Sequence, residues 1–155
     1  GEEPYAYKIA QSIVKKRVIT TTFELVEAIK EALPSKVLSQ KGHPAKKTFQ
    51  ALRIAVNGEL DSLEGFLNSF DELLNEGGRL VIISFQSLED RLVKHRFKEL
   101  TTDNSDRKIP LAIKDIDRPK YRLLAKKGLR ATKEELSENN RSHSAILRAI
   151  EKVRS

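Results

Sequence analysis

The stretch Asn75-Glu76-Gly77-Gly78-Arg79-Leu80-Val81-Ile82-Ile83-Ser84-Phe85 decides how this sequence is expected to fold. Its two glycines suit the end of a helix, because glycine adopts the left-handed conformation of a helix C-cap without steric cost. The residues that follow are rich in Val and Ile and show no polar alternation. Such a run is typical of a strand that is covered on both faces of a parallel sheet. The passage therefore predicts an α/β fold with a strand at residues 79–85.

Helical periodicity surrounds this strand on both sides. Apolar residues recur at spacings of three and four over residues 49–74, which predicts one long helix, or two helices that break at Asn57-Gly58. A second helical stripe follows the strand at residues 88–100. Ser87 and Asp90 have the spacing of a helix cap before it, and one open interpretation is that they serve only as that cap.

The C-terminal third combines polar and regular segments. Residues 101–120 are polar and rich in turn residues, so we expect a connection there. Residues 121–125 suit a strand, and residues 132–138 suit a short capped helix. The pattern over residues 144–153 fits either a helix or a strand. We favour a strand, because residues 121–125 would otherwise lack a hairpin partner.

The N-terminal third is expected to be helical. Residues 5–17 carry one apolar helical stripe, and Thr21 with Glu24 forms a capping box for a second helix that ends at Leu33. Residues 34–47 are polar and interrupted, which indicates a loop. Two such short helices cannot bury their stripes alone, so a small helical lobe is expected.

The composition excludes several classes of protein. The 155 residues contain no Cys, which removes disulfides, thiolate metal sites and cysteine nucleophiles and favours a cytosolic setting. No apolar run approaches the roughly 18 residues of a membrane span. The three histidines have no ligand-like spacing, so no metal site is expected, and no Gly-x-Ser-x-Gly turn indicates a hydrolase. A chain that starts at Gly1 without Met is expected to be a processed product or a piece of something longer.

The charge is unevenly distributed. Lys and Arg number 29 against 22 Asp and Glu, a formal net charge of +7. Basic residues concentrate at 36–47 and 118–133, around an acidic middle. Such clusters suit a polyphosphate partner, because each neutralised phosphate releases counterions. A solvated basic surface is the alternative.

Several separated blocks resemble the small-subunit (16S) ribosomal RNA cytosine-N4 methyltransferase family, in the right order and over essentially the whole chain. They are Gly1-Glu2-Glu3, Ile19-Thr20-Thr21-Thr22-Phe23-Glu24-Leu25, Lys47-Thr48-Phe49-Gln50-Ala51-Leu52-Arg53-Ile54, Val56-Asn57, Glu59-Leu60, Val81-Ile82-Ile83-Ser84-Phe85-Gln86-Ser87-Leu88-Glu89-Asp90-Arg91, Glu138-Asn139-x-Arg141 and Ser144-Ala145-x-Leu147-Arg148.

The resemblance implies the second half of a class I (Rossmann-like) methyltransferase sheet plus a small all-helical insert lobe. Residues 1–45 would be part of the insert, and residues 46–155 the C-terminal part of the α/β domain. Family members hold S-adenosyl-L-methionine with a glycine-rich turn, an acidic residue and an Asp-Leu-Gly segment before the insert. Nothing in this sequence matches those elements, so no cofactor-binding residue is expected in this chain, and the chain alone is expected to be inactive.

The implied function is methylation of the N4 amine of a cytosine in small-subunit ribosomal RNA by a cytoplasmic enzyme without a membrane anchor. A homodimer and an association with a missing N-terminal half are both open. One alternative is a non-catalytic RNA-binding or structural fragment that lacks the cofactor site. Another is a split enzyme or pseudo-enzyme that is partnered by a second chain.

Ligands of open α/β sheets sit beyond the carboxyl ends of the strands, which points to the loop after residue 84. Phe85 is expected either to stack on an unstacked base or to lie in the core. Gln86 stands where the family usually carries His, and His143 where it usually carries Arg; Gln cannot shuttle a proton, and no catalytic residue is assigned. The candidates for substrate contact are Asn57, Ser84, Phe85, Gln86, Ser87, Arg53 and Arg91, the two arginines having a salt bridge as their alternative. The candidates for the RNA backbone are Lys46, Lys47, Arg122, Lys126, Lys127 and Arg130.

Overall fold

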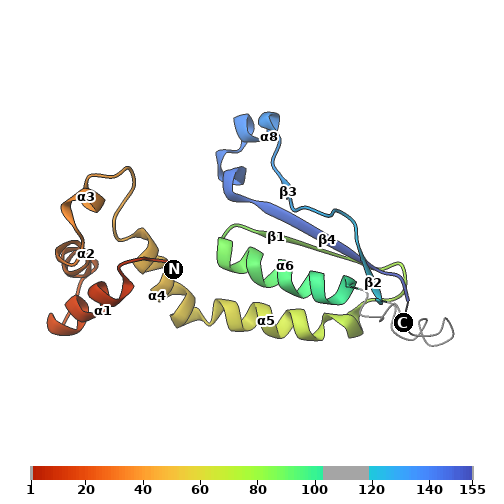
Figure 1. Ribbon diagram of the computed structural model, residues 1–155, viewed down its shortest axis with the longest axis horizontal. Helices are drawn as coiled ribbons and strands as arrows, with labels where there is room; N and C mark the ends of the chain where they lie inside the picture. The colour runs from red at the N-terminus through yellow and green to blue at the C-terminus, as the bar shows by residue number, and fades with distance from the viewer. Residues whose placement is uncertain (1, 103–118, 155) are drawn as a thin grey trace, which may run out of the picture. The chain divides into compact units, whose positions relative to one another are not determined.

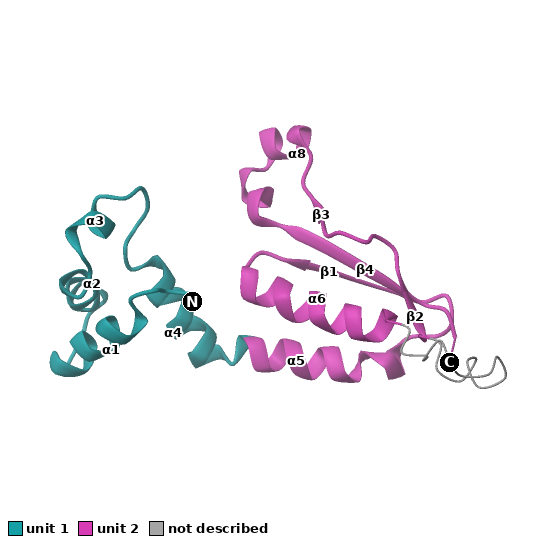
Figure 2. Ribbon diagram, viewed as in Figure 1, with its two compact units in different colours: residues 1–59 teal, residues 60–155 magenta. Residues whose placement is uncertain are grey.

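The structure is a computed structural model that describes residues 2–102 and 119–154 (Figure 1). The chain divides into two compact units, unit 1 at residues 1–59 and unit 2 at residues 60–155 (Figure 2). Most of the connection expected at residues 101–120 lies outside the described residues.

Unit 1 is helical, as expected. Its helices are α1 (Ala6–Lys15), α2 (Thr22–Glu31), α3 (Ser35–Leu38) and α4 (Lys46–Asn57). The predicted capping box is confirmed, because Thr21 Oγ1 accepts from the Glu24 N–H at 3.2 Å and Glu24 Oε2 accepts from the Thr21 N–H at 3.2 Å. The core of the unit comprises Ile9, Ile29, Leu33 and Ala45.

One expectation for unit 1 was wrong. The segment 34–47 is not a continuous loop, because α3 forms one short helix directly after Pro34. Proline has a fixed φ and suits the residue that opens a helix, and Val37 from this helix packs against the core. The polar, interrupted composition of residues 34–47 therefore did not reveal the single helical turn of α3.

The predicted break at Asn57-Gly58 is confirmed. α4 ends at Asn57, and Gly58 adopts the left-handed conformation with φ of 60°. A side chain would be strained at that φ, which is why glycine suits the position. α5 (Glu59–Ser69) follows and continues into the short 3-10 helix η1 (Phe70–Leu73).

Unit 2 combines a small sheet with helices. Its further elements are β1 (Arg79–Ser84), α6 (Ser87–Thr101), β2 (Tyr121–Leu123), β3 (Leu129–Arg130), α8 (Lys133–Glu138), the 3-10 helix η2 (Asn140–Ser144) and β4 (Ile146–Lys152). The sheet order is β1-β4-β2, and β3 also pairs with β4. Residues 144–153 therefore contain a strand, as favoured, and it pairs with β2 as expected. The mixed helices and strands confirm the α/β class.

The pairing of the described strands differs from the expectation for β1. Every strand pair among the described residues is antiparallel, and the register places Arg79 opposite Glu151 and Ser84 opposite Ile146. The apolar run of β1 had predicted parallel neighbours and cover on both faces. Strand β3, only two residues long, was not predicted.

One face of the sheet packs against helices. Leu80 and Ile82 of β1 and Ile150 of β4 point to this side, where they meet Val93 and Phe97 of α6. α6 runs alongside β1 and β4 (Figure 1). Leu67, Phe70 and Tyr121 complete the core, and the rings of Phe70 and Tyr121 meet edge to face with centroids 5.6 Å apart.

Tyr121 also carries a polar contact out of this core. Its hydroxyl donates to Asp71 Oδ1, and Lys152 Nζ lies 3.0 Å from the same carboxylate oxygen. Burial raises the pKa of Tyr121 above its ordinary range, and the neighbouring carboxylate adds to this effect. The contact ties β2 and β4 to η1.

The opposite face of the sheet carries exposed apolar residues. Val81 and Ile83 of β1 retain 52% and 54% exposure, and Leu129 of β3 retains 55%. The register places all three on the side away from α6. We call this side of the sheet the open face; Arg79, Val81, Ile83, Arg122 and Leu129 are exposed on it, whereas Leu147 is half-buried and Ala149 and Glu151 are buried.

An ion-pair ladder crosses one end of the open face. Arg79 Nε lies 2.9 Å from Glu151 Oε2, and one terminal guanidinium nitrogen of Arg122 lies 2.7 Å from Glu151 Oε1. Arg79 first and then Arg122 hold the pKa of Glu151 below its usual value. One carboxylate thus serves two arginines on three adjacent strands.

α4, which we expected in the α/β domain, lies in unit 1. The family-level boundary between residues 45 and 46 stays a prediction. In the part of the chain that the structure describes, no helix is both long and apolar enough to cross a membrane.

Candidate functional site

The loop after β1 gathers four of the predicted site residues. β1 ends at Ser84 and α6 begins at Ser87, so Phe85 and Gln86 form the link. Phe85 is 54% exposed and thus lies at the surface instead of in the core. Gln86 is half-buried, Ser87 is exposed, and Ser84 is buried. We refer to these four residues as the 84–87 loop.

A largely buried ion pair holds this loop from below. Arg148 Nε lies 2.7 Å from Asp90 Oδ1, and a terminal nitrogen of the same guanidinium lies 3.0 Å from Oδ2. The two side chains are only 16% and 15% exposed. Arg148 holds the pKa of Asp90 below its ordinary value, although burial opposes this effect. The pair joins the first turn of α6 to β4.

Ser84 belongs to the same cluster. Its Oγ lies 3.4 Å from Asp90 Oδ1 and 3.4 Å from the carbonyl oxygen of Ile146, and both are acceptors. With 3% of the residue exposed, this hydroxyl is directed into the protein. The structure thus places Ser84 beneath the loop surface and Phe85 upon it.

The interpretation that Asp90 serves only as a helix cap is wrong. α6 has Gln86 as its N-cap residue, with no side-chain cap hydrogen bond, and Asp90 is bound to Arg148. Instead, Glu89 Oε2 accepts from the Phe85 N–H at 3.3 Å. A carboxylate in the first turn is also favourable to the helix dipole. Arg148 was not among the predicted site residues. The signal available in the sequence was its position in the block Ser144-Ala145-x-Leu147-Arg148, which resembles the family.

Asn57 and Arg53 lie in unit 1 and share one partner there. The guanidinium of Arg53 contacts both carboxylate oxygens of Glu59, at 2.8 and 3.1 Å, and Asn57 Nδ2 donates to Glu59 Oε1 at 3.1 Å. Arg53 first and then Asn57 lower the pKa of Glu59. The salt-bridge alternative for Arg53 is therefore confirmed.

Arg91 lies along a groove of about 400 Å³ beside α5 and α6. Asp61 and Glu64 line the same groove, so its charge is mixed. His95 and three leucines complete the lining: Leu60, Leu88 and Leu92.

The predicted RNA-backbone residues divide between the units. Lys126, Lys127 and Arg130 are exposed on and before β3, whereas Arg122 is paired with Glu151. In unit 1, Lys46 and Lys47 line a groove of about 510 Å³ together with Lys41 and His43. Lys47 Nζ also donates to the Glu2 carbonyl oxygen at 3.1 Å.

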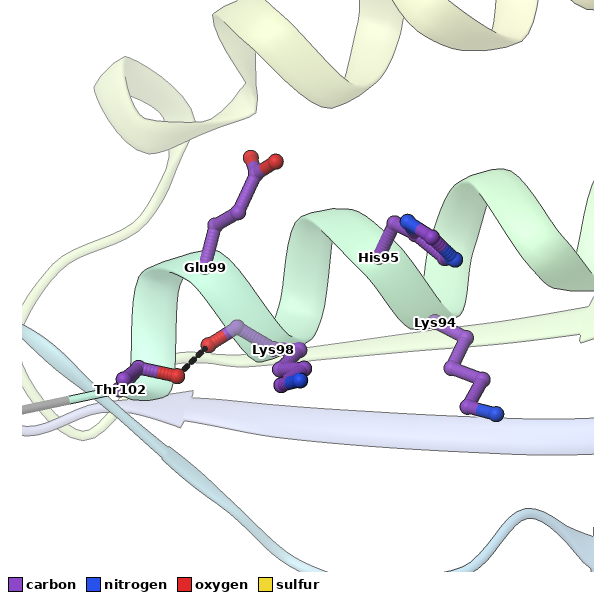
Figure 3. A pocket seen from close by; sticks show the side chains of 5 residues that line it. All are labelled: Lys94, His95, Lys98, Glu99 and Thr102. Atoms are coloured by element: carbon purple, nitrogen blue, oxygen red, sulfur yellow. Dashed lines mark hydrogen bonds between the residues drawn. The ribbon is translucent and has the colours of Figure 1, made fainter.

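A shallow hollow of about 470 Å³ lies along the C-terminal half of α6 (Figure 3). The side chains of Lys94 and Lys98 point to one side of the helix, and that of Glu99 points to the other. Thr102 Oγ1 donates to the Lys98 carbonyl oxygen at 2.5 Å. Its lining holds exposed charged side chains and no nucleophile paired with a base. Across residues 2–102 and 119–154, no three His, Asp or Glu side chains gather in a way that could hold a metal ion.

The turn from β1 to α6 does not fit a nucleotide-type cofactor such as S-adenosyl-L-methionine. A nucleotide-type cofactor in such folds needs a glycine-bearing turn between strand and helix, where backbone N–H groups stay free to approach it. The turn from β1 to α6 contains no glycine, and its Phe85 N–H is already bound to Glu89. The glycines with positive φ, Gly42, Gly58 and Gly77, lie outside that turn.

Comparisons with known proteins show the family to which the chain is similar. Residues 1–153 match the model of the MraW methylase family. The chain is similar to proteins named ribosomal RNA small subunit methyltransferase H, with 54% identity in Oenococcus oeni, 49% in Mesoplasma florum and 46% in Streptococcus mutans. These matches cover 98–99% of the chain but only 49–50% of each relative, so the chain spans about half their length. Because the family match runs through almost every residue of both units, the chain belongs to the MraW methylase family.

Proposed function

We propose that this chain is the C-terminal part of an S-adenosyl-L-methionine-dependent methyltransferase that acts in the cytoplasm on the N4 amine of a cytosine in small-subunit ribosomal RNA. The observation that carries the proposal is 46–54% identity, over nearly the whole chain, to relatives named for small-subunit ribosomal RNA methylation. The cofactor supplies the methyl group, and we assign its binding to residues outside this chain, because the turn after β1 does not fit it.

The role proposed for this chain is to hold the substrate. Methyl transfer to an exocyclic amine depends on alignment of the amine with the donor more than on a strong acid. An RNA base must leave its stack before an enzyme can reach that amine, and exposed aromatic rings stack on such bases. Phe85, half exposed at the end of β1, is the candidate for this contact. The amide of Gln86 offers a donor and an acceptor for the base edge.

Ser84 and the Asp90–Arg148 pair are proposed to support the loop without touching the substrate. The Ser84 hydroxyl is buried and faces acceptors within the protein, which favours this supporting role. Arg53 and Asn57 are proposed as weaker candidates than Phe85, because Glu59 already engages both side chains. Arg91 shares its groove with Asp61 and Glu64, which disfavours an anionic ligand there.

The exposed cations are proposed to bind the RNA backbone. Lys126, Lys127 and Arg130 cluster near β3, and Lys46 and Lys47 line the groove of unit 1. Each phosphate contact contributes a slope of roughly 0.7–0.9 to the dependence of log K on log salt. Arg122 is the weakest member of this set, because it is held by Glu151.

The test is RNA binding by this chain to a small-subunit ribosomal RNA transcript over a range of salt concentrations. Lys126→Gln/Lys127→Gln is expected to reduce the slope by about 1.4–1.8. Lys94→Gln/Lys98→Gln removes the same charge from α6 and serves as the matched control. Equal slopes for the two double variants would remove residues 126 and 127 from the interface.

A second measurement separates the enzyme from a non-catalytic RNA-binding fragment. Methylation of the transcript is measured with this chain and the unmatched part of a relative together, and Phe85→Ala is expected to reduce the rate while Phe85→Tyr retains it. Calorimetry of S-adenosyl-L-methionine with this chain alone should show no binding. Ordinary affinity in that experiment would refute the assignment of the cofactor site to the other part.

A further inference from the structure

Strand β4 brings two segments of the proposed RNA surface to the same position of the sheet. Ile146, its first residue, pairs with Ser84 of β1 on one side and with Arg130 of β3 on the other. Neighbouring strands are about 4.8 Å apart, so the Cα atoms of Ser84 and Arg130 are separated by about 10 Å. The 84–87 loop and residues 126–130, which we call the cationic turn, therefore lie at the same end of the sheet.

The cationic turn approaches β4 closely at Gly128. A Cβ atom at this position would lie 2.4 Å from Cγ2 of Ile146 and 3.3 Å from Cζ of Arg148. The first distance is far shorter than van der Waals contact between carbon atoms. The Cγ2 atom also belongs to a β-branched side chain, which has little rotational freedom. A side chain at residue 128 would therefore displace the turn from β4.

The same glycine places the turn against the ion pair that supports the 84–87 loop. The Arg148 guanidinium beside Gly128 is the one that contacts the Asp90 carboxylate at 2.7 and 3.0 Å. Asp90 lies in the first turn of α6, and its neighbour Glu89 accepts from the Phe85 N–H. A continuous set of contacts thus leads from the turn to the loop. Arg148 also neutralises the charge of Asp90, which lowers the repulsion of an anion at the turn.

Phe85 and Arg130 are exposed at the two ends of this arrangement. Within residues 2–102 and 119–154, no hydrogen bond or ion pair engages the Arg130 side chain. Because Arg130 and Ser84 both pair with Ile146, the Arg130 side chain starts from the same face of the sheet as that of Ser84. A guanidinium can form two parallel hydrogen bonds to a phosphate. A single nucleotide can bridge the span between Phe85 and Arg130.

We propose that the 84–87 loop and the cationic turn form one site for a single extruded nucleotide, in which Phe85 stacks on the base, Arg130 binds the phosphate of the same nucleotide, and Gly128 is the positioning residue that keeps the two contacts together. The inference rests on the proposed function, which supplies the base contact of Phe85. It goes further by assigning Arg130 to the nucleotide whose base leaves the stack instead of to flanking RNA. The phosphate contact orients that base, and methyl transfer to an exocyclic amine depends on such alignment.

The test is an NMR titration of this chain with cytidine and with its 5′- and 3′-monophosphates. All three compounds should shift the amide signals of the 84–87 loop. At least one monophosphate should also shift the Arg130 amide and bind about tenfold more tightly than cytidine, as expected for a charge-assisted contact. Arg130→Gln should abolish this preference without changing the affinity for cytidine, and Phe85→Ala should weaken all three compounds. Lys94→Gln removes one charge from α6 and, as the matched control, should keep the preference.

A second set of variants tests the positioning role of Gly128. Gly128→Ala should lower the preference for the monophosphate towards that of Arg130→Gln, because the added methyl group displaces the turn. Gly128→Ala/Ile146→Ala removes the Cγ2 atom that the methyl group meets and should restore the preference. Ile146→Ala alone is the control for the loss of that side chain.

The outcomes separate this inference from the proposed function. Equal affinity for cytidine and both monophosphates, or a preference that persists in Arg130→Gln, would overturn the inference and leave the base contact of Phe85 in place. An unaltered preference in Gly128→Ala, or no restoration in the double variant, would overturn the role of Gly128. If none of the three compounds shifted the 84–87 loop, both the inference and the proposed base contact would be wrong.

Discussion

Asp90→Asn is expected to destabilise unit 2 strongly. The substitution keeps the size of the side chain but leaves the Arg148 guanidinium, 16% exposed, without a counter-charge. Removal of one partner from a buried pair costs about 3–5 kcal/mol, and the remaining exposure of this pair moves the expected loss of unfolding free energy to about 2–4 kcal/mol. Ser84 loses strength in its contact with the same carboxylate, so the 84–87 loop should loosen together with the end of β1.

The assay is native-state hydrogen exchange by NMR, which reports the free energy of opening at individual amides of β1 and β4 and keeps the two units separate. Glu99→Gln is the matched control, because Glu99 lies on the same helix in an exposed pair with Arg96. Arg148→Met completes a double-mutant cycle. A loss below about 1 kcal/mol for Asp90→Asn, or additive effects in the cycle, would refute the view that this pair holds the loop.

Three further outcomes follow from other parts of the structure. Phe97→Ala should cost about 3–5 kcal/mol of unfolding free energy in unit 2, measured by urea denaturation, because the side chain is 1% exposed in the core; Phe97→Leu should cost clearly less. Thr21→Ala should lower the stability of unit 1 by about 1 kcal/mol through loss of the capping box, with Thr22→Ala as the neighbouring control, and exchange at the Glu24 amide should report it. Asp90 has a lowered pKa in the folded state, so its contribution is complete above its ordinary pKa of 3.8 and is lost as the pH falls through the lowered value. Acid unfolding of Asp90→Asn should therefore depend less on pH in that range, and an unchanged pH dependence would contradict the assignment.

The local elements were predictable because short-range rules determine them. The capping box at Thr21, the glycine break at Gly58 and the strand after Gly77-Gly78 each depend on a few neighbouring residues, and the structure contains all three. The choice of a strand over a helix for residues 144–153 was also right. It rested on the need of residues 121–125 for a partner, which is a tertiary argument that periodicity alone could not supply.

The misses have a different physical origin. Asp90 has the spacing of a helix cap after Ser87, but its charge is taken by Arg148, 58 positions further along the chain. Such long-range pairs cannot be identified from the pattern of a single sequence. The role of Ser84 in substrate contact stays a prediction, and the sequence could not show that its hydroxyl is buried. Phe85 was expected either to stack on a base or to lie in the core. Its exposure in the structure decides against the core.

The central position of β4 has a consequence for how the chain acquires its structure during synthesis. Among the described residues, the three other strands all pair with β4, and β4 is the last of the four to be made. More than sixty further residues must therefore be translated after β1 before β4 can pair with it. The core of unit 1, in contrast, can form once residues 5–49 have been synthesised. Contacts of such large sequence separation form slowly. A nascent chain that stalls before residue 146 would present the apolar β1 without β4, a species that a chaperone would be expected to bind.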